Sequence, residues 1–341
     1  MSPRTIRSCE SQRSLAHPDT LLVGPRYFGT EIAASADVLS RIRKPAAQYL
    51  YVRAVRRLLH RFDPILWEGV EAKRAAVQTH IEEVEDLLSD LLPDRPVPEE
   101  GTLAKSLQAI GERCAKIAAA VSDNIPINQI RKAVFWAHTT GQSRAKVIII
   151  ESAEGMLDSS RNALLKTLEE PPSGVYLIMT STRRGAIIPT ILSRLRPYHF
   201  PGRSKEAERE VLSKIFREDN PEYHELRDYF LAWNDTDIEY LRTETDRFLD
   251  GVLDRGGHGR PDEELLAFLS GGKVFKPFLE QLSRACGDIL KGRDEKGRAI
   301  PVRRLEAFSG LIRECATQSD QYNQSSSLLL ECLYYNMRSR E

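Results

Sequence analysis

Two glycines at a predicted strand-to-helix turn mark the first place where chemistry could reside. A loop that binds nucleotide phosphates reads G-x-x-x-x-G-K-[ST], in which the lysine contacts the phosphates and the hydroxyl binds Mg²⁺. Gly24 and Gly29 fit this spacing, but Thr30 stands at the lysine position and Glu31 at the hydroxyl position. The segment 24–31 therefore predicts a degenerate phosphate loop, with an unrelated Gly-Pro turn as the alternative.

The Glu31 carboxylate would repel a triphosphate bound at such a loop. Two like charges about 4 Å apart repel by roughly 4 kcal/mol at an effective dielectric constant near 20. Repulsion of this size weakens binding by a factor of roughly 1,000. We therefore expect that this chain binds no nucleotide, cofactor or metal ion of its own.

A second acidic position follows the next predicted strand, at Glu151. In phosphate-loop ATPases a carboxylate at this place orients Mg²⁺, and a following acidic residue positions the attacking water. Glu151 could serve as the first of these, but Ser152 cannot serve as the second. The pattern indicates a degenerate Walker B position, and an acidic strand end without function is the alternative.

Strands that alternate with helices must position these residues. Apolar runs at 20–23, 147–150 and 175–179 predict buried strands, and the second, β-branched throughout, is expected to be central and buried on both faces. A helix is predicted at 159–170, between the last two strands. This order is typical of a parallel α/β sheet, whereas only helical patterns follow residue 203.

Two further helices are predicted directly after the loop, at 31–42 and 47–62. The second carries four arginines, which we interpret as a solvated basic face, with DNA contact as the alternative. They are Arg53, Arg56, Arg57 and Arg61.

Residues 70–122 contain two heptad seams separated by a segment, 93–101, that contains three prolines and cannot continue a helix. The seams are Val77, Ile81, Val84, Leu88 and Leu91, and then Leu103, Leu107, Ile110, Cys114, Ile117 and Val121. We predict an antiparallel helical hairpin that projects from the body of the protein. The alternative is that both helices pack on that body.

Composition restricts the function. The chain has 341 residues, 41% of them hydrophobic, which is enough for two or three domains with real cores. Lys plus Arg and Asp plus Glu both number 49, so we expect contact with DNA only within a larger assembly. The five cysteines lack metal-ligand spacing, and neither a signal peptide nor a membrane span is evident. These features predict a reduced, cytoplasmic setting.

The strongest signal is the block 162–172, NALLKTLEEPP, followed by 189–196, PTILSRLR. Here the chain resembles the delta-prime branch of the bacterial AAA+ clamp-loader family of DNA polymerase III, which has N-A-L-L-K-x-L-E-E-P-P and P-T-I-x-S-R-C. The chain departs from this pattern at Leu195, where the family has cysteine. Residues 125–131, 62–67, and 322–324 with 328–333 are similar to a helix entry, a strand and the last collar helix of the family.

The resemblance implies a ring of subunits with a nucleotide at each subunit boundary. Arg194, next to Ser193, would then be an arginine finger that reaches the γ-phosphate held by a neighbouring subunit, and Arg196 is a second candidate. Thr180 and Ser181 occupy the sensor-1 position. For Arg194 the alternative is a surface arginine that pairs with a neighbouring acid.

We therefore expect an AAA+-like α/β domain at 1–202, with the hairpin inserted, a helical lid at 203–245 and a helical collar at 246–341. The expected function is that of a non-catalytic subunit that helps to load a sliding clamp onto primed DNA. Its expected partners in a hetero-oligomeric ring are a gamma/tau-like ATPase and a delta-like subunit, without a membrane and near the nucleoid. An active AAA+ ATPase and a replisome-independent interaction module are the alternatives.

Overall fold

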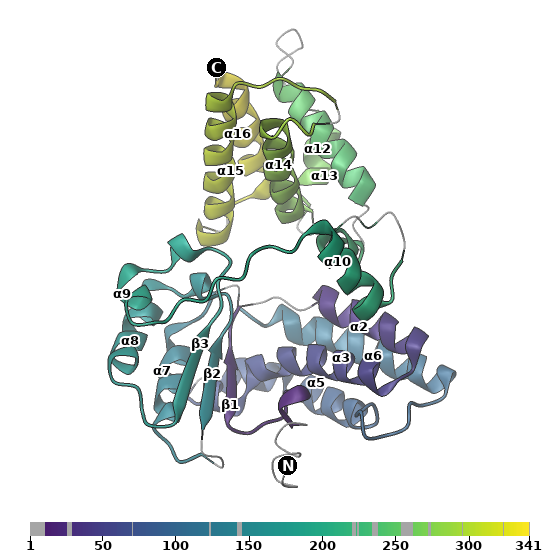
Figure 1. Ribbon diagram of the computed structural model, residues 1–341, viewed down its shortest axis with the longest axis vertical. Helices are drawn as coiled ribbons and strands as arrows, with labels where there is room; N and C mark the ends of the chain where they lie inside the picture. Colours follow the sequence, from purple (N-terminus) through teal and green to yellow (C-terminus); the bar gives the residue numbers. More distant parts are fainter. Residues whose placement is uncertain are drawn as a thin grey trace. The chain divides into compact units, whose positions relative to one another are not determined.

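The computed structural model describes the chain in several stretches, and its elements form two compact units, 1–221 and 222–341 (Figure 1). The described residues are 11–25, 29–69, 71–122, 124–141, 145–219, 223, 225–233, 238–253, 262–271, 274–294, 296–322 and 324–340. The division into three domains stays a prediction. Its boundary at 245 falls within helix α12 (Ile238–Leu253), which continues on both sides of that residue.

Three parallel strands form the sheet of the first unit, in the order β1-β2-β3. They are β1 (Thr20–Val23), β2 (Lys146–Ile150) and β3 (Val175–Met179). All three predicted strands and their parallel arrangement are thus confirmed. The carboxyl ends of β1 and β2 lie side by side, because Val23 pairs with Ile150.

The two later strands are less buried than their sequences predict. In β2, Ile148 and Ile150 are buried whereas Ile149 is half-buried. β3 lies at the edge of the sheet, and its Tyr176 and Ile178 side chains are 61% and 48% exposed. The prediction that β3 is a buried strand is therefore wrong. Helices cover one of its faces, where alternate residues pack, and leave the other open.

A group of helices and short turns covers that face of the sheet (Figure 1). They are α4 (Pro64–Trp67), α7 (Ile127–Ala137), α8 (Asp158–Glu169) and α9 (Pro189–Leu192), with the 3-10 turns η2 (Ala153–Gly155) and η3 (Arg184–Ala186). Trp136, Leu164 and Ile191 meet Ile148 and Ile150 in their core. The helix predicted at 159–170 is confirmed as α8.

The segment 62–67, which resembles a strand of the family, is helical instead. The 3-10 turn η1 (His60–Phe62) leads into α4. The Asp63 carboxylate accepts from the Ile65 amide at 3.0 Å, and Pro64 occupies the first turn of the helix. An aspartate cap followed by proline favours the start of a helix, so the strand prediction is wrong here.

Four longer helices lie beside β1 in the first unit (Figure 1). They are α2 (Gly29–Ile42), α3 (Pro45–Leu59), α5 (Glu71–Ser89) and α6 (Glu100–Ala119). The heptad residues of α5 and α6 are buried and these helices pack against each other, so the predicted hairpin is confirmed.

The hairpin does not project, however, because α6 also packs on α2 and α3. Its connecting segment is tied to α3 by Gln48, which is fully buried and donates to the carbonyl oxygens of Leu92 and Arg95 at 3.0 and 3.1 Å. Arg43 donates to the Pro98 carbonyl at 2.7 Å. The prediction of a projecting hairpin is wrong, and the alternative of packing on the body holds.

The first unit ends with α10 (Lys205–Val211) and the π-helical turn η4 (Leu212–Phe216). Arg41 of α2 donates to the carbonyl oxygens of Phe216 and Arg217 at 3.0 and 2.9 Å. A guanidinium at these open carbonyls joins the end of the turn to α2.

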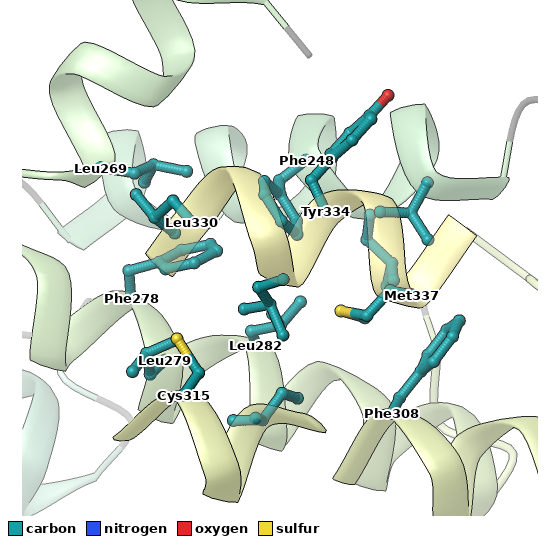
Figure 2. Packing of buried hydrophobic residues seen from close by; sticks show 14 of the residues in the cluster. Phe248, Leu269, Phe278, Leu279, Leu282, Phe308, Cys315, Leu330, Tyr334 and Met337 are labelled. Carbon is teal, nitrogen blue, oxygen red and sulfur yellow. The ribbon is translucent and has the colours of Figure 1, made fainter. Parts of the chain in front are cut away.

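The second unit is helical throughout its described residues, as the sequence predicts. Its helices are α11 (Leu226–Ala232), α12, α13 (Glu263–Leu269), α14 (Phe275–Leu290), α15 (Val302–Tyr322) and α16 (Ser326–Ser339). Figure 2 shows part of the core that α12 to α16 share, in which Phe248 meets Phe278 and Tyr334 edge to face at 5.1 and 5.4 Å. Of the segment resembling the last collar helix, residue 322 ends α15 and residues 328–333 lie in α16, whereas residue 324 lies between the helices and residue 323 lies outside the described residues.

A cluster of charges fixes the loop between α14 and α15. Arg298 pairs with Asp294 at 2.7 Å, Asp246 at 2.6 Å and Asp250 at 3.1 Å. Hydrogen bonds from Arg298 hold the pKa of Asp294 below its ordinary value, against the effect of burial. The loop is thereby attached to α12.

Candidate functional site

The two acidic residues of the predicted degenerate loop come together at the carboxyl ends of β1 and β2. Glu31 lies in the first turn of α2, and Glu151 follows β2. Arg57 of α3 joins them: its Nη1 lies 2.5 Å from Glu31 Oε2, and its Nε lies 3.0 Å from Glu151 Oε1. Residues 26–28 of the loop lie outside the described residues, whereas Thr30 is described at the start of α2.

A second arginine completes this cluster. Arg61 Nη2 donates to Glu151 Oε2, and the Arg61 side chain is only 3% exposed. A Cβ atom added to Gly24 would lie 2.7 Å from Arg61 Nη2 and 3.1 Å from the Glu151 Cβ. Glycine at position 24 thus allows the backbone at the end of β1 to approach the ion pair closely. We call Glu31, Arg57, Arg61 and Glu151 the charge cluster.

The charge cluster corrects the interpretation of α3 as a solvated basic face. Arg57 and Arg61 are four positions apart, so both point from one side of the chain toward Glu151. Arg56 donates to the Ser14 carbonyl at 3.0 Å, and only Arg53 of the four arginines is exposed. The available signal was an i, i+4 arginine pair in a chain that also has acidic residues at both degenerate phosphate-loop positions, Glu31 and Glu151.

The charge cluster pairs two guanidinium groups with two carboxylates. Burial lowers the pKa of Arg57, but the carboxylates of Glu151 and Glu31 more than offset this effect and raise it. Burial dominates for Arg61, whose pKa is lowered although Glu151 opposes the shift. Both guanidiniums stay protonated near neutral pH, because arginine titrates far above it. Two positive and two negative charges leave no net charge among these four side chains to attract a polyphosphate.

The predicted sensor-1 segment braces the turn after β2. The Thr180 carbonyl accepts from the Ala153 amide at 2.9 Å, and the Thr180 hydroxyl accepts from the Ser152 amide at 3.4 Å. Ser152 itself has a left-handed backbone conformation with φ of 48°. Ser181 Oγ accepts from the Arg183 amide at 3.1 Å, within the segment. The structure therefore brings Thr180 next to the turn that carries Glu151.

Arg194 lies at a different place, directly after α9. Its Nη2 and Nε donate to Glu169 Oε1, at the end of α8, at 2.5 and 3.1 Å. Its Nη1 donates to the Thr190 carbonyl at 2.7 Å and to Ser193 Oγ at 3.3 Å. Within this chain Arg194 thus pairs with the neighbouring Glu169, and its role as an arginine finger stays a prediction. Arg196, the second candidate, stacks its guanidinium on Tyr198, with Cζ 5.4 Å from the ring centroid.

The described residues lack the features of a metal centre and of a membrane span. They contain no group of three or more His, Cys, Asp and Glu side chains that could hold a metal ion. None of their helices combines the length and apolar character needed to cross a membrane. Cys114, Cys286 and Cys315 are buried free thiols and Cys332 is an exposed one, whereas Cys9 lies outside this part of the chain.

Comparison with known proteins locates the similarity in the middle of the chain. Residues 100–204 match the family model described as DNA polymerase III, delta subunit. This stretch contains α8, Glu169, α9 and Arg194. The charge cluster is only partly included, because Glu31, Arg57 and Arg61 precede it.

Curated relatives are similar over short segments. A DNA polymerase III subunit delta' of Pseudomonas aeruginosa is 39% identical over 71 residues, which cover 20% of this chain and 22% of the relative. A subunit delta' of Haemophilus influenzae is 29% identical over 29% of this chain and 31% of its own length. A subunit gamma/tau of Mycobacterium tuberculosis is 34% identical over 26% of this chain and 15% of its own length. The chain thus spans less than a third of each of these relatives.

A solved structure is also similar to this chain. A DNA polymerase III gamma subunit-related protein of Thermotoga maritima has a TM-score of 0.35 and 18% identity, over 64% of this chain and 80% of that one.

Proposed function

Since the chain is a member of the DNA polymerase III clamp-loader family, we propose that it is a non-catalytic, delta-prime-like subunit of a clamp loader. In this role it binds no ATP and lends Arg194 to the nucleotide of a neighbouring gamma/tau-like ATPase. The ring would also contain a delta-like subunit and would act in the cytoplasm on a sliding clamp and primed DNA.

The observation that carries this proposal is the charge cluster. A working phosphate loop presents a lysine and a hydroxyl to Mg²⁺ and the phosphates, whereas this chain has Thr30 and Glu31 at those positions. The Glu31 and Glu151 carboxylates, which could have faced a metal ion, accept from Arg57 and Arg61 instead. A nucleotide would have to break these partly buried charge pairs, which is costly because it leaves unpaired charges behind, above all on the nearly buried Arg61.

The place of Arg194 supports the second part of the proposal. The residue follows α9, is about one third exposed, and lies in the family-matched stretch away from the charge cluster. An arginine at a subunit boundary can stabilise the charge that develops on a transferred phosphoryl group. An arginine finger of this kind contributes a factor of about 10³ to 10⁵ in the phosphate-loop enzymes where it has been measured.

Binding of ATP by the isolated chain tests the first part. Titration calorimetry with Mg-ATP should give no measurable heat of binding at millimolar nucleotide. The matched control is the gamma/tau-like subunit of the same organism under identical conditions. ATP turnover by the isolated chain would overturn the proposal and favour an active ATPase, a class to which the similarity with gamma/tau subunits also points.

Reconstitution tests the second part. The chain is assembled with its gamma/tau-like and delta-like partners, clamp and primed DNA, and ATP turnover is compared with Arg194→Ala and with Arg203→Ala as an exposed control. We expect a large fall for Arg194→Ala with unchanged assembly. Equal turnover would mean that Arg194 faces no nucleotide. Failure to assemble with any of these partners would favour an interaction module outside the replisome.

A further inference from the structure

Glu169 accepts hydrogen bonds from the Nε–Nη2 edge of the Arg194 guanidinium, an edge that could also donate to a phosphate. One carboxylate oxygen, Oε1, accepts from both Nε at 3.1 Å and Nη2 at 2.5 Å. These two donors form one of the planar forks with which arginine binds carboxylates and phosphates. The two residues are 25 positions apart, and α8 and α9 bring them together.

The other side of the guanidinium is held independently of Glu169. Nη1 donates to the Thr190 carbonyl at 2.7 Å and to Ser193 Oγ at 3.3 Å. Both acceptors belong to the turn that carries Arg194 itself. Loss of the Glu169 carboxylate would therefore leave the arginine attached through Nη1 and its Nε–Nη2 edge open.

We propose that Glu169 is a resident anion that occupies Arg194 in the free chain and is replaced by a nucleotide phosphate in the assembled ring. This inference rests on the proposed function and adds to it a residue that controls access to Arg194. The carboxylate competes for the Nε–Nη2 edge, and if it stayed there it would repel an arriving phosphate. Because Glu169 is half exposed and Arg194 about one third exposed, the ion pair is weak enough to be exchanged.

The exchange makes a specific kinetic prediction. Glu169→Gln removes the competing charge, so the KM for ATP of the reconstituted ring should fall by about two- to fivefold, the range set by exposed ion pairs. The kcat should not change, because Arg194 is free of Glu169 in both the bound state and the transition state. The fold should also persist, since a negative charge at the end of α8 does not favour that helix.

The experiment compares ATP turnover by rings that contain the wild-type chain, Glu169→Gln, Arg194→Ala or both substitutions. Glu170→Gln, which removes the same charge from the next exposed residue, is the matched control and should behave as wild type. In the Arg194→Ala background, Glu169→Gln should have no further effect, because its action passes through the arginine.

The outcomes separate the two proposals. If Arg194→Ala leaves turnover unchanged, the proposed function fails and this inference fails with it. If Arg194→Ala lowers turnover while Glu169→Gln leaves KM unchanged or raises it, only the exchange is wrong. The exchange is also wrong if Glu169→Gln still lowers KM in the Arg194→Ala background, or if Glu170→Gln lowers KM to the same extent.

Discussion

Arg61 donates to Glu151 from a position where the arginine side chain is almost completely excluded from solvent. Glu151 keeps Arg57 as a partner, but it loses the hydrogen bonds and packing of a nearly buried side chain, so Arg61→Ala should lower the free energy of unfolding by about 1–3 kcal/mol. Chemical denaturation followed by circular dichroism measures this loss. Arg53→Ala, at an exposed position of α3, should change stability by less than about 0.5 kcal/mol. Equal losses for the two variants would mean that the pair does not stabilise the fold.

The two glycines of the degenerate loop should respond differently to alanine. At Gly24 the new methyl group would meet Arg61 and Glu151, whereas at Gly29 no atom lies within 4 Å of the added Cβ. Gly24→Ala should therefore cost about 1–3 kcal/mol through overpacking. Gly29→Ala should be neutral or slightly stabilising, because alanine favours the helix that begins there. The thermal unfolding midpoints of the two variants decide the question, and a harmless Gly24→Ala would refute the close packing.

The helical hairpin should be indispensable for folding of the first unit. Replacement of residues 71–122 by a short Gly-Ser linker would expose apolar residues of α2 and α3 and leave the buried Gln48 amide without its two acceptors. An unpaired buried amide alone costs about 1–3 kcal/mol. We expect a chain that is degraded rapidly by protease and lacks cooperative unfolding. A deletion variant that unfolds as cooperatively as wild type would instead indicate an independent module.

Acid should weaken the second unit through Asp294. Its hydrogen bonds from Arg298 hold its folded-state pKa below the ordinary value of about 3.9 for an aspartate. The stability that they contribute is therefore complete above that ordinary value and is lost as the pH falls through the folded-state pKa. Asp294→Asn should lower stability at pH 7 by about 1 kcal/mol and should have a smaller effect at pH 2.

Urea unfolding at the two pH values measures this difference. Asp288→Asn, which removes an equal charge outside the Arg298 cluster, is the matched control. A stability loss for Asp294→Asn that does not depend on pH would contradict the role of its charge.

Much of the fold follows from local patterns in the sequence. The β-branched run at 147–150 and the proline stop after 170 are strong local signals, and β2 and α8 form there. The heptads likewise predicted the hairpin. Its packing on α2 and α3 could not be predicted, because a heptad seam shows that a helix face is buried and does not name the partner. The exposed face of β3 escaped prediction for the same reason: its apolar residues do not reveal that the strand lies at a sheet edge.

The sequence identified the acidic residues of the candidate site, but it did not reveal which residues contact them. Glu31 and Glu151 were identified by their positions relative to a phosphate-loop pattern. Their pairing with Arg57 of α3 and Arg61 of η1 was not predicted, because four arginines on a predicted helix also fit a solvated surface. Similarly, the spacing of Arg194 and Glu169 in the chain did not disclose that the end of α8 meets the turn after α9.

The charge cluster has a consequence for how this protein would take part in a cycle driven by hydrolysis. Arg57 of α3 and Arg61 of the following turn η1 connect this segment to the first turn of α2 and to the end of β2, entirely with side chains of the same polypeptide. None of these ion pairs involves a nucleotide, so hydrolysis of ATP would neither form nor break them directly. Under the proposed function, the moment at which these elements move would therefore be set by ATP hydrolysis in the neighbouring subunits.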